Sequence, residues 1–260
     1  MSTIEALILG IIQGLSEFLP ISSSGHLEIG KVLLGANTAE SMSFTLAVHG
    51  ATVLSTLVIF RKEIIQLICG LFKFEWNEET KYLAKIALSM IPILVVGLCF
   101  EEQLESLFTG NIVLVGCMLL YTAVLLGFTY FKKSGNKTIS FIDAFIIGIA
   151  QAIAAVPGIS RSGSTIATGL LLGNKKEEIS KFSFLMVLVP IMGANFLKLL
   201  DSDFSAGAEI SGVSILVGAL AAFVVGLLAC RWMIKIVNKG KLIWFAVYCL
   251  VVGITAIVFA

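Results

Sequence analysis

The sequence predicts an all-α polytopic membrane protein with an inverted-topology repeat, built from six transmembrane helices and two re-entrant helical hairpins. Three observations predict this fold class. The chain is too apolar for a soluble domain, its apolar segments come in two lengths, and its two halves resemble each other over an ungapped stretch. We expect the whole chain, residues 1–260, to form a single membrane domain.

The composition places most of the surface in lipid. Hydrophobic residues make up 58% of the 260 residues and charged residues only 13%, more apolar surface than one soluble core can bury. The net charge of +1 gives no indication of a nucleic-acid partner. The five cysteines lack the paired spacing of a zinc site and are interpreted as small hydrophobic residues. No basic region precedes the first apolar segment at Ile4, which argues against a secretory signal.

The apolar segments divide into spans and hairpins. A helix needs about 20 apolar residues to cross the hydrocarbon of a bilayer. The segments 4–19 and 141–156 are shorter, and each is followed by Pro, Gly and Ser and then a second short apolar piece. This pattern is typical of hairpins that enter the membrane and turn back, which line a protein-enclosed or water-filled site. The segments that reach or approach spanning length are 43–60, 82–100, 111–131, 182–200, 211–230 and 242–260.

Basic residues predict the orientation, because cytoplasmic loops are enriched in Lys and Arg. Basic clusters follow the first, third and fifth spans and precede the fourth, so all of them fall on one side; Lys133 belongs to the second cluster. The loops of the other side carry Glu101, Glu105, Asp203 and Glu209. We therefore expect a multi-pass protein of the inner (plasma) membrane, with these acidic loops and the C-terminus facing outward.

An internal repeat relates the two halves. Shifting the chain by 138 positions aligns the 26 residues from Gly10 to Gly35 with those from Gly148, with ten identities and no gap. Each half then holds one hairpin, at about 4–36 or 141–173, followed by three spans. Because three is odd, the second half (138–260) is inverted relative to the first (1–131). The two hairpins enter from opposite faces and their turns meet near the midplane.

Both hairpin turns carry residues that suit a phosphate. Ser and Gly stand where a new short helix begins, and such turns present backbone N–H groups and a positive dipole end to an anion. Each hydroxyl is expected either to contact the ligand or to cap its helix. The hydroxyl residues at these turns are Ser22, Ser23 and Ser24, and Ser160, Ser162, Ser164 and Thr165.

Arg161 and Glu17 are the charged candidates. An arginine within a membrane hairpin is costly unless it is paired or faces a polar cavity, and its planar fork suits phosphate. Arg161 is therefore expected to bind phosphate or to form a structural ion pair with Glu17. Gln13 stands four residues before Glu17 on the same helix face. The Glu17 carboxylate, with Gln13 beside it, is expected to hold Mg²⁺ or Ca²⁺ or to tune His26.

The two histidines are expected to have different roles. His26 follows Ser-Gly directly and is expected to act as general base, general acid or nucleophile. His49 lies inside a full span and is expected to be structural, with its ring bordering the cavity as the alternative. Glu28 and Lys31, three residues apart, are expected to pair with each other.

With these residues in view, the chain resembles the bacterial undecaprenyl-diphosphate phosphatases, the family associated with bacitracin resistance. The resemblance rests on two motifs, Gln13-Gly14-Leu15-Ser16-Glu17 with the following Ser24-Gly25-His26, and Pro157-Gly158-Ile159-Ser160-Arg161-Ser162-Gly163-Ser164-Thr165. Two positions depart from the family pattern: many members have Glu where this chain has Gln13, and an acid is common where it has Thr45.

The resemblance implies removal of the terminal phosphate from a C55 isoprenoid diphosphate, with a divalent cation, Mg²⁺ or Ca²⁺, at a site open to the outer face. It implies a polyprenyl diphosphate and membrane lipids as partners and leaves a homodimer open. By position, Glu17 matches the essential acid, and Ser23, His26, Ser160, Arg161 and Thr165 match catalytic or phosphate-binding positions. We expect Ser23, His26 or a water molecule activated by His26 to attack the terminal phosphorus. The strongest rival is a transporter or flippase for an anion or lipid head group, because inverted repeats with re-entrant hairpins are a transporter architecture.

Overall fold

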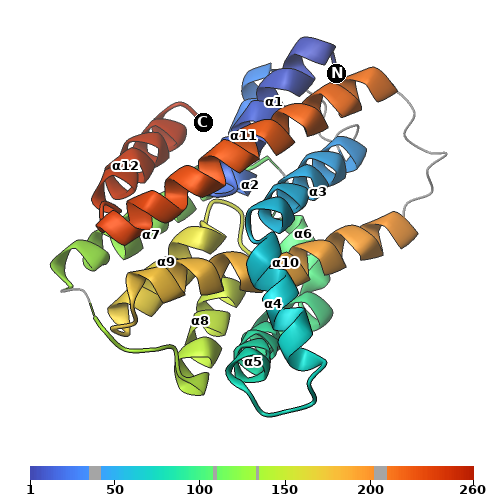
Figure 1. Cartoon of the computed structure of the whole chain (residues 1–260). Helices are drawn as coiled ribbons and strands as arrows, with labels where there is room; N and C mark the ends of the chain where they lie inside the picture. Colours follow the sequence, from blue (N-terminus) through green and yellow to red (C-terminus); the bar gives the residue numbers. More distant parts are fainter. Residues whose placement is uncertain (35–41, 108–109, 133–134, 202–209) are drawn as a thin grey trace.

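The computed structural model of the chain describes residues 1–34, 42–107, 110–132, 135–201 and 210–260 (Figure 1). All regular elements of this part of the chain are helices, apart from one isolated bridge between Lys137 and Asn174. The predicted all-α class is therefore confirmed. The helices are α1 (Thr3–Ser16), α2 (Ser23–Leu34), α3 (Met42–Ile59), α4 (Arg61–Leu71), α5 (Glu78–Cys99), α6 (Glu101–Ser106), α7 (Ile112–Phe131), α8 (Phe141–Ile153), α9 (Arg161–Leu171), α10 (Lys176–Asp201), α11 (Gly212–Lys239) and α12 (Ile243–Val258).

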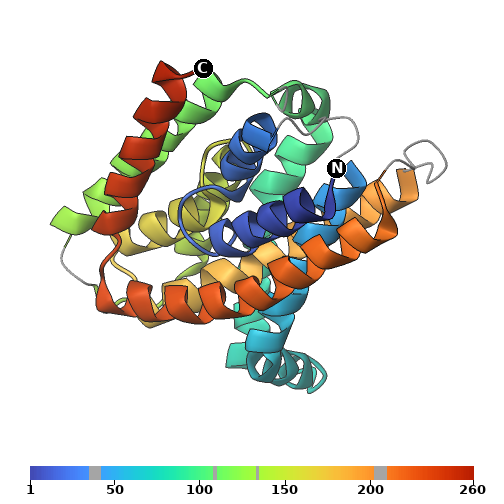
Figure 2. The ribbon, with the colours of Figure 1, turned by 90° about the horizontal axis from the view of Figure 1, so that it is seen from above.

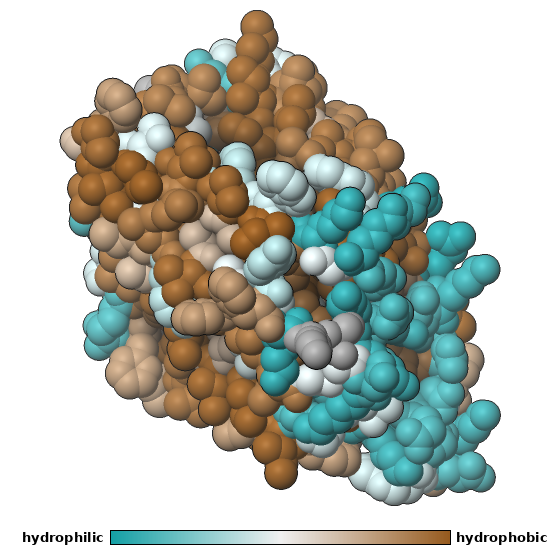
Figure 3. All heavy atoms as spheres, turned by 90° about the vertical axis from the view of Figure 1, so that its left-hand side faces the viewer, coloured by the Kyte–Doolittle hydropathy of each residue, from teal (hydrophilic) through white to brown (hydrophobic). Residues whose placement is uncertain are grey.

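Among these helices, α5, α7 and α11 are each long and apolar enough to cross a membrane. A fourth span results if α3 and α4 are taken together, although the chain bends by 74° between them. The predicted segment 242–260 forms α12, whose 16 residues are short for a span. Figure 3 shows a face that is apolar over most of its area, and large apolar side chains such as Leu98, Val124 and Leu228 are exposed. These features define a multi-pass membrane protein.

The first helix of each predicted hairpin packs against a long helix of the other half. Helix α1 lies along α11, and α8 packs on α5; α7 and α12 lie side by side (Figure 2). Glycine permits both close approaches. A Cβ added to Gly10 would lie 2.3 Å from the carbonyl oxygen of Gly218, and one added to Gly148 would lie 2.4 Å from that of Ser89.

Helices α1 and α8 share structural features at residues that are 138 positions apart. Ser2 and Glu5 form a capping box at the start of α1, and Ser140 and Asp143 form one at the start of α8. Gly10 and Gly148 are also 138 apart. Each helix therefore begins in the same way and approaches its neighbour at the same turn.

Some predicted features lie outside the described residues. These are Lys133 of the basic clusters, Asp203 and Glu209 of the acidic loops, and the last part of the first hairpin, including Gly35.

Candidate active site

Each hairpin has a turn between its two helices. The first turn, residues 17–22, joins α1 to α2; the second turn, residues 154–160, joins α8 to α9. Ser22 closes the first turn with a φ of +70°, and Gly158 in the second has a φ of +94°. A left-handed conformation at a serine is uncommon and costs of order 1 kcal/mol or more. The surrounding structure holds Ser22 in this conformation and so fixes where α2 begins.

Matching serines cap the helices that follow. The hydroxyl of Ser22 accepts a hydrogen bond from the backbone N–H of Gly25 at 3.3 Å, and that of Ser160 accepts one from Gly163 at 3.0 Å. Ser22 lies 3.3 Å from the hydroxyl of Ser24, and Ser160 lies 3.4 Å from that of Ser162. Of the two expected roles, capping is the one that Ser22 and Ser160 perform in this structure.

The two turns are in contact. The Ser162 hydroxyl donates to the backbone carbonyl of Leu19 at 3.3 Å. A Cβ added to Gly25 would lie 3.1 Å from the Cα of Gly158. The two short helices, α2 and α9, thus begin next to each other, and their N-terminal ends face a common region.

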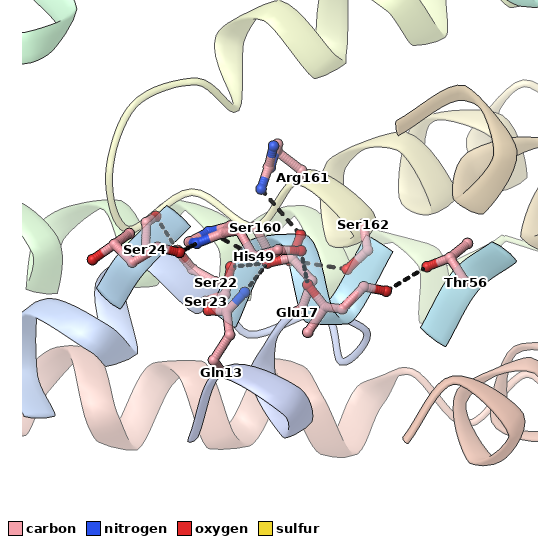
Figure 4. A network of polar contacts seen from close by, with 12 residues as sticks. Gln13, Glu17, Ser22, Ser23, Ser24, His49, Thr56, Ser160, Arg161 and Ser162 are labelled. Atoms are coloured by element: carbon pink, nitrogen blue, oxygen red, sulfur yellow. Dashed lines mark hydrogen bonds and ion pairs between the residues drawn. The ribbon is translucent and has the colours of Figure 1, made fainter. Parts of the chain in front are cut away.

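Glu17 is the centre of the polar network at this meeting point (Figure 4). The Arg161 guanidinium donates to Glu17 Oε1 at 3.0 Å. The other carboxylate oxygen, Oε2, accepts from the Ser23 hydroxyl at 2.6 Å and from the Gln13 amide at 2.9 Å. His49 Nε2 lies 3.8 Å from the same oxygen. One carboxylate of the first turn therefore connects the N-terminal ends of α2 and α9 with helix α3.

The charge pair of Glu17 and Arg161 is largely shielded from water. The Glu17 side chain is 8% exposed and that of Arg161 is 29% exposed. A carboxylate removed from water to this degree is stable only when it is paired and hydrogen-bonded. The Arg161 side chain remains partly exposed while it is paired with Glu17.

His26 lies in a different environment. Its Nδ1 is 2.9 Å from the Ser22 carbonyl oxygen, and its Nε2 is 2.8 Å from the Tyr248 hydroxyl on α12. Because a carbonyl cannot donate, Nδ1 carries the proton and Nε2 of the neutral ring accepts from Tyr248. The two rings stack with centroids 5.6 Å apart. His26 is thus oriented by Tyr248 rather than by Glu17.

The hydroxyl of Thr165 points into the protein. It is fully buried, donates to the Arg161 carbonyl at 2.9 Å and lies 2.5 Å from the Ser183 hydroxyl on α10. In this arrangement Thr165 supports the first turn of α9, from which Arg161 projects. The Ser164 hydroxyl is buried and has no partner in the described part of the chain.

A small cavity opens beside the Glu17–Arg161 pair. Its volume is about 30 Å³, room for one or two water molecules. Polar residues form one side of it, while the opposite side is apolar and comes mostly from α10. The lining residues are Glu17, Phe18, Thr52, Val53, Thr56, Arg161, Ser162, Ser183, Phe184, Val187, Leu188 and Ile191.

Two residues that lie at the site, His49 and Tyr248, were not predicted to be site residues. His49 was expected to be structural, with the cavity border as the alternative, and it lies beside Glu17. Its only signal in the sequence is the presence of an imidazole within an apolar span. Tyr248 has no signal in the sequence, because its contact with His26 joins residues 222 apart. The predicted pair of Glu28 and Lys31 is confirmed at 3.3 Å.

Fold and site together define a helical membrane protein with a buried, charged site where two helical hairpins meet. The chain belongs to the family described as bacitracin resistance protein BacA, whose family model matches residues 6–255. The predicted family is therefore confirmed.

Its relatives cover nearly the full length of the chain and share one name, undecaprenyl-diphosphatase. The relative from Bacteroides fragilis is 56% identical over 262 residues, covering 99% of this chain and 98% of the relative. The relative from Christiangramia forsetii is 54% identical over 263 residues, covering 100% and 99%. The relative from Methanococcus maripaludis is 40% identical over 258 residues, covering 98% and 99%.

Proposed function

We propose that this protein is an integral membrane phosphatase that hydrolyses undecaprenyl diphosphate to undecaprenyl phosphate and inorganic phosphate. The observation that carries the proposal is the contact between Arg161 and Glu17 across the two turns, in a chain whose full-length relatives are named undecaprenyl-diphosphatase. Hydrolysis regenerates the monophosphate carrier lipid of cell-wall synthesis and thereby confers bacitracin resistance.

The site suits an amphiphile with a diphosphate head. Arg161 and the N-terminal ends of α2 and α9 offer a cation and backbone N–H groups to the phosphates. The apolar side of the cavity, with Val187, Leu188 and Ile191, suits the first isoprene units.

Ser23 is the nucleophile that the geometry favours. Its hydroxyl already donates to the Glu17 carboxylate at 2.6 Å, so Glu17 is placed to accept the proton as Ser23 Oγ attacks the terminal phosphorus. The P–O bond to the bridging oxygen breaks, and undecaprenyl phosphate leaves. Water then hydrolyses the phosphoserine and restores the hydroxyl. His26, which is oriented by Tyr248, would act as a proton carrier.

The remaining hydroxyl groups mainly stabilise the helix ends that form the site. Ser22 and Ser160 hold the helix ends as caps, and Thr165 braces α9. Ser24 and Ser162 bond to these capping serines and offer their hydroxyls to the phosphate oxygens.

A divalent cation, Mg²⁺ or Ca²⁺, fits two residues of the network. The Glu17 carboxylate is a hard oxygen ligand, and the Gln13 side-chain oxygen is buried with no donor among the described residues. Among those residues no group of three His, Cys, Asp or Glu converges on a metal, so phosphate oxygens are expected to complete the shell. When bound, the cation neutralises part of the charge of the diphosphate.

The membrane arrangement is proposed to be an inverted repeat of two halves, 1–131 and 138–260, with six spans and two re-entrant hairpins. Support comes from the matching capping boxes, close-approach glycines and serine caps at residues 138 apart. We place the chain in the inner membrane among its lipids. The basic clusters face the cytoplasm, and the site opens to the outer face.

The experiment is phosphate release by the purified chain in detergent, with undecaprenyl diphosphate and shorter isoprenoid diphosphates, with and without a chelator. We expect release that the chelator abolishes and that added Mg²⁺ or Ca²⁺ restores. A transporter or flippase releases no phosphate in detergent, so absence of release under all conditions contradicts the proposal.

A further inference from the structure

His49 lies on the carboxylate that organises the site. It projects from α3, and its side chain is 17% exposed. Its Nε2 lies 3.8 Å from Glu17 Oε2, the carboxylate oxygen that Arg161 does not contact. Figure 4 shows the ring among the side chains of the two turns.

The tautomer of His49 follows from its other nitrogen. Nδ1 lies 2.9 Å from the backbone carbonyl oxygen of Thr45. Because that oxygen can only accept, Nδ1 carries the proton, and Nε2 of the neutral ring has a lone pair. Nε2 and the carboxylate oxygen Oε2, 3.8 Å apart, are then two neighbouring acceptors.

A third acceptor belongs to the same cluster. The Gln13 amide donates to Glu17 Oε2, while its own oxygen is buried and has no partner among the described residues. Unsatisfied buried acceptors are uncommon and call for a cation, a water or a proton. Half a turn of the Gln13 amide about its last bond exchanges its N–H₂ group for its oxygen, which removes the donor and supplies a ligand.

The separation between His49 and Glu17 fits a single metal ion. Bonds to nitrogen and oxygen of about 2.0–2.2 Å each sum to roughly 4.2 Å, more than the 3.8 Å between Nε2 and Oε2. The two atoms are therefore close enough for one ion to reach both. A hydrogen bond cannot span this distance directly.

We propose that His49 Nε2 is a nitrogen ligand of the divalent cation held by Glu17 and Gln13, and that the site consequently prefers a metal that accepts imidazole, such as Mn²⁺, to Mg²⁺ or Ca²⁺. The inference rests on the proposed function, whose cation it specifies. Mg²⁺ and Ca²⁺ take oxygen ligands, whereas imidazole suits Zn²⁺, Fe²⁺ and Ni²⁺. Mn²⁺, a first-row transition ion that binds both carboxylate oxygen and imidazole nitrogen, lies between the two groups. Arg161 stays on Oε1, so the cation and the guanidinium occupy opposite oxygens of the carboxylate.

The test uses the full chain, purified in detergent without a histidine tag and loaded with Mn²⁺ alone. Pulsed electron paramagnetic resonance detects nitrogen bound to Mn²⁺ as modulation of the electron spin echo. The chain has only two histidines, so His26→Gln and His49→Gln separate the two sources. Size-exclusion profiles confirm that each variant is folded, and His49→Asn replaces His49→Gln if the latter is not.

We expect nitrogen modulation in the wild type and in His26→Gln, and none in His49→Gln. Loss of a nitrogen ligand is expected to weaken Mn²⁺ binding at least about tenfold and Ca²⁺ binding less than about twofold. Three results overturn the inference. The first is Mn²⁺ bound to the wild-type protein without nitrogen modulation, the second is nitrogen modulation that persists in His49→Gln, and the third is a wild-type protein that binds no Mn²⁺. The first of these is the result expected if a water or a proton on Nε2 fills the gap.

Phosphate release measured on the same preparations separates this inference from the proposed function. Release of phosphate without nitrogen-coordinated Mn²⁺ rejects the His49 ligand and leaves the phosphatase assignment intact. Nitrogen-coordinated Mn²⁺ without release of phosphate supports the His49 ligand and rejects the phosphatase assignment.

Discussion

The Tyr248 hydroxyl on α12 donates a 2.8 Å hydrogen bond to Nε2 of His26 on α2. Together with the Ser22 carbonyl on Nδ1, it fixes both the tautomer and the ring plane of His26. Helix α12 thus contributes a residue that orients a histidine of the first hairpin.

The first prediction concerns this hydrogen bond. We expect Tyr248→Phe to lower kcat about fivefold, because the loss of one neutral hydrogen bond of about 1 kcal/mol leaves His26 less well oriented. KM should change little, since Tyr248 does not contact the Glu17–Arg161 pair. Steady-state phosphate release from undecaprenyl diphosphate measures both constants. An unchanged or higher kcat means that the hydroxyl does not position His26 for the reaction.

The second prediction concerns the Ser23 hydroxyl, which is bonded to Glu17 at 2.6 Å. We expect Ser23→Ala to lower kcat by at least about 100-fold, because the variant has lost the attacking oxygen. Ser180→Ala is a suitable control, since its hydroxyl is also buried but donates to the Glu177 carbonyl in α10. If Ser23→Ala turns over at a rate close to that of the control, water or His26 is the nucleophile instead.

The third prediction concerns the packing of α1 on α11. A Cβ at Gly10 would lie 2.3 Å from the Gly218 carbonyl oxygen, whereas a Cβ at Gly127 meets no atom within 4 Å. We expect Gly10→Ala to destabilise the protein by roughly 1–3 kcal/mol through overpacking. Gly127→Ala should be neutral or stabilising by up to about 1 kcal/mol through helix propensity. Thermal unfolding in detergent compares the two, and equal Tm values contradict the close approach.

The hairpins were predictable because their signals are local. The capping boxes and the serine caps each depend on residues a few positions apart, so the repeat preserves them and a shift of 138 reveals them. Glu17, Ser23 and Arg161 were identified for the same reason: charged and hydroxyl residues at membrane depth stand out from an apolar background.

Contacts between distant helices were not predictable. His49 lies beside Glu17 only because of how α3 is rotated about its axis, and Tyr248 meets His26 only because α12 packs beside α7, which also contacts α2. The apolar segment 43–60 likewise gave no sign of the 74° bend that follows α3. Neither helix rotation nor a bend between helices is specified by the hydropathy of a single segment.

In the proposed reaction, Arg161 at the start of α9 binds the phosphoryl group that Ser23 attacks, while Glu17 of the first turn accepts the Ser23 proton. The most direct test is the rate of phosphate release from undecaprenyl diphosphate by Glu17→Gln and Arg161→Lys. Glu79→Gln and Arg231→Lys are the matched controls outside the site. We expect losses of about 100-fold or more in both site variants, because lysine cannot reproduce the guanidinium fork and glutamine cannot accept the Ser23 proton. The two controls should release phosphate at rates close to wild type. Near wild-type turnover in either site variant would contradict the proposed reaction.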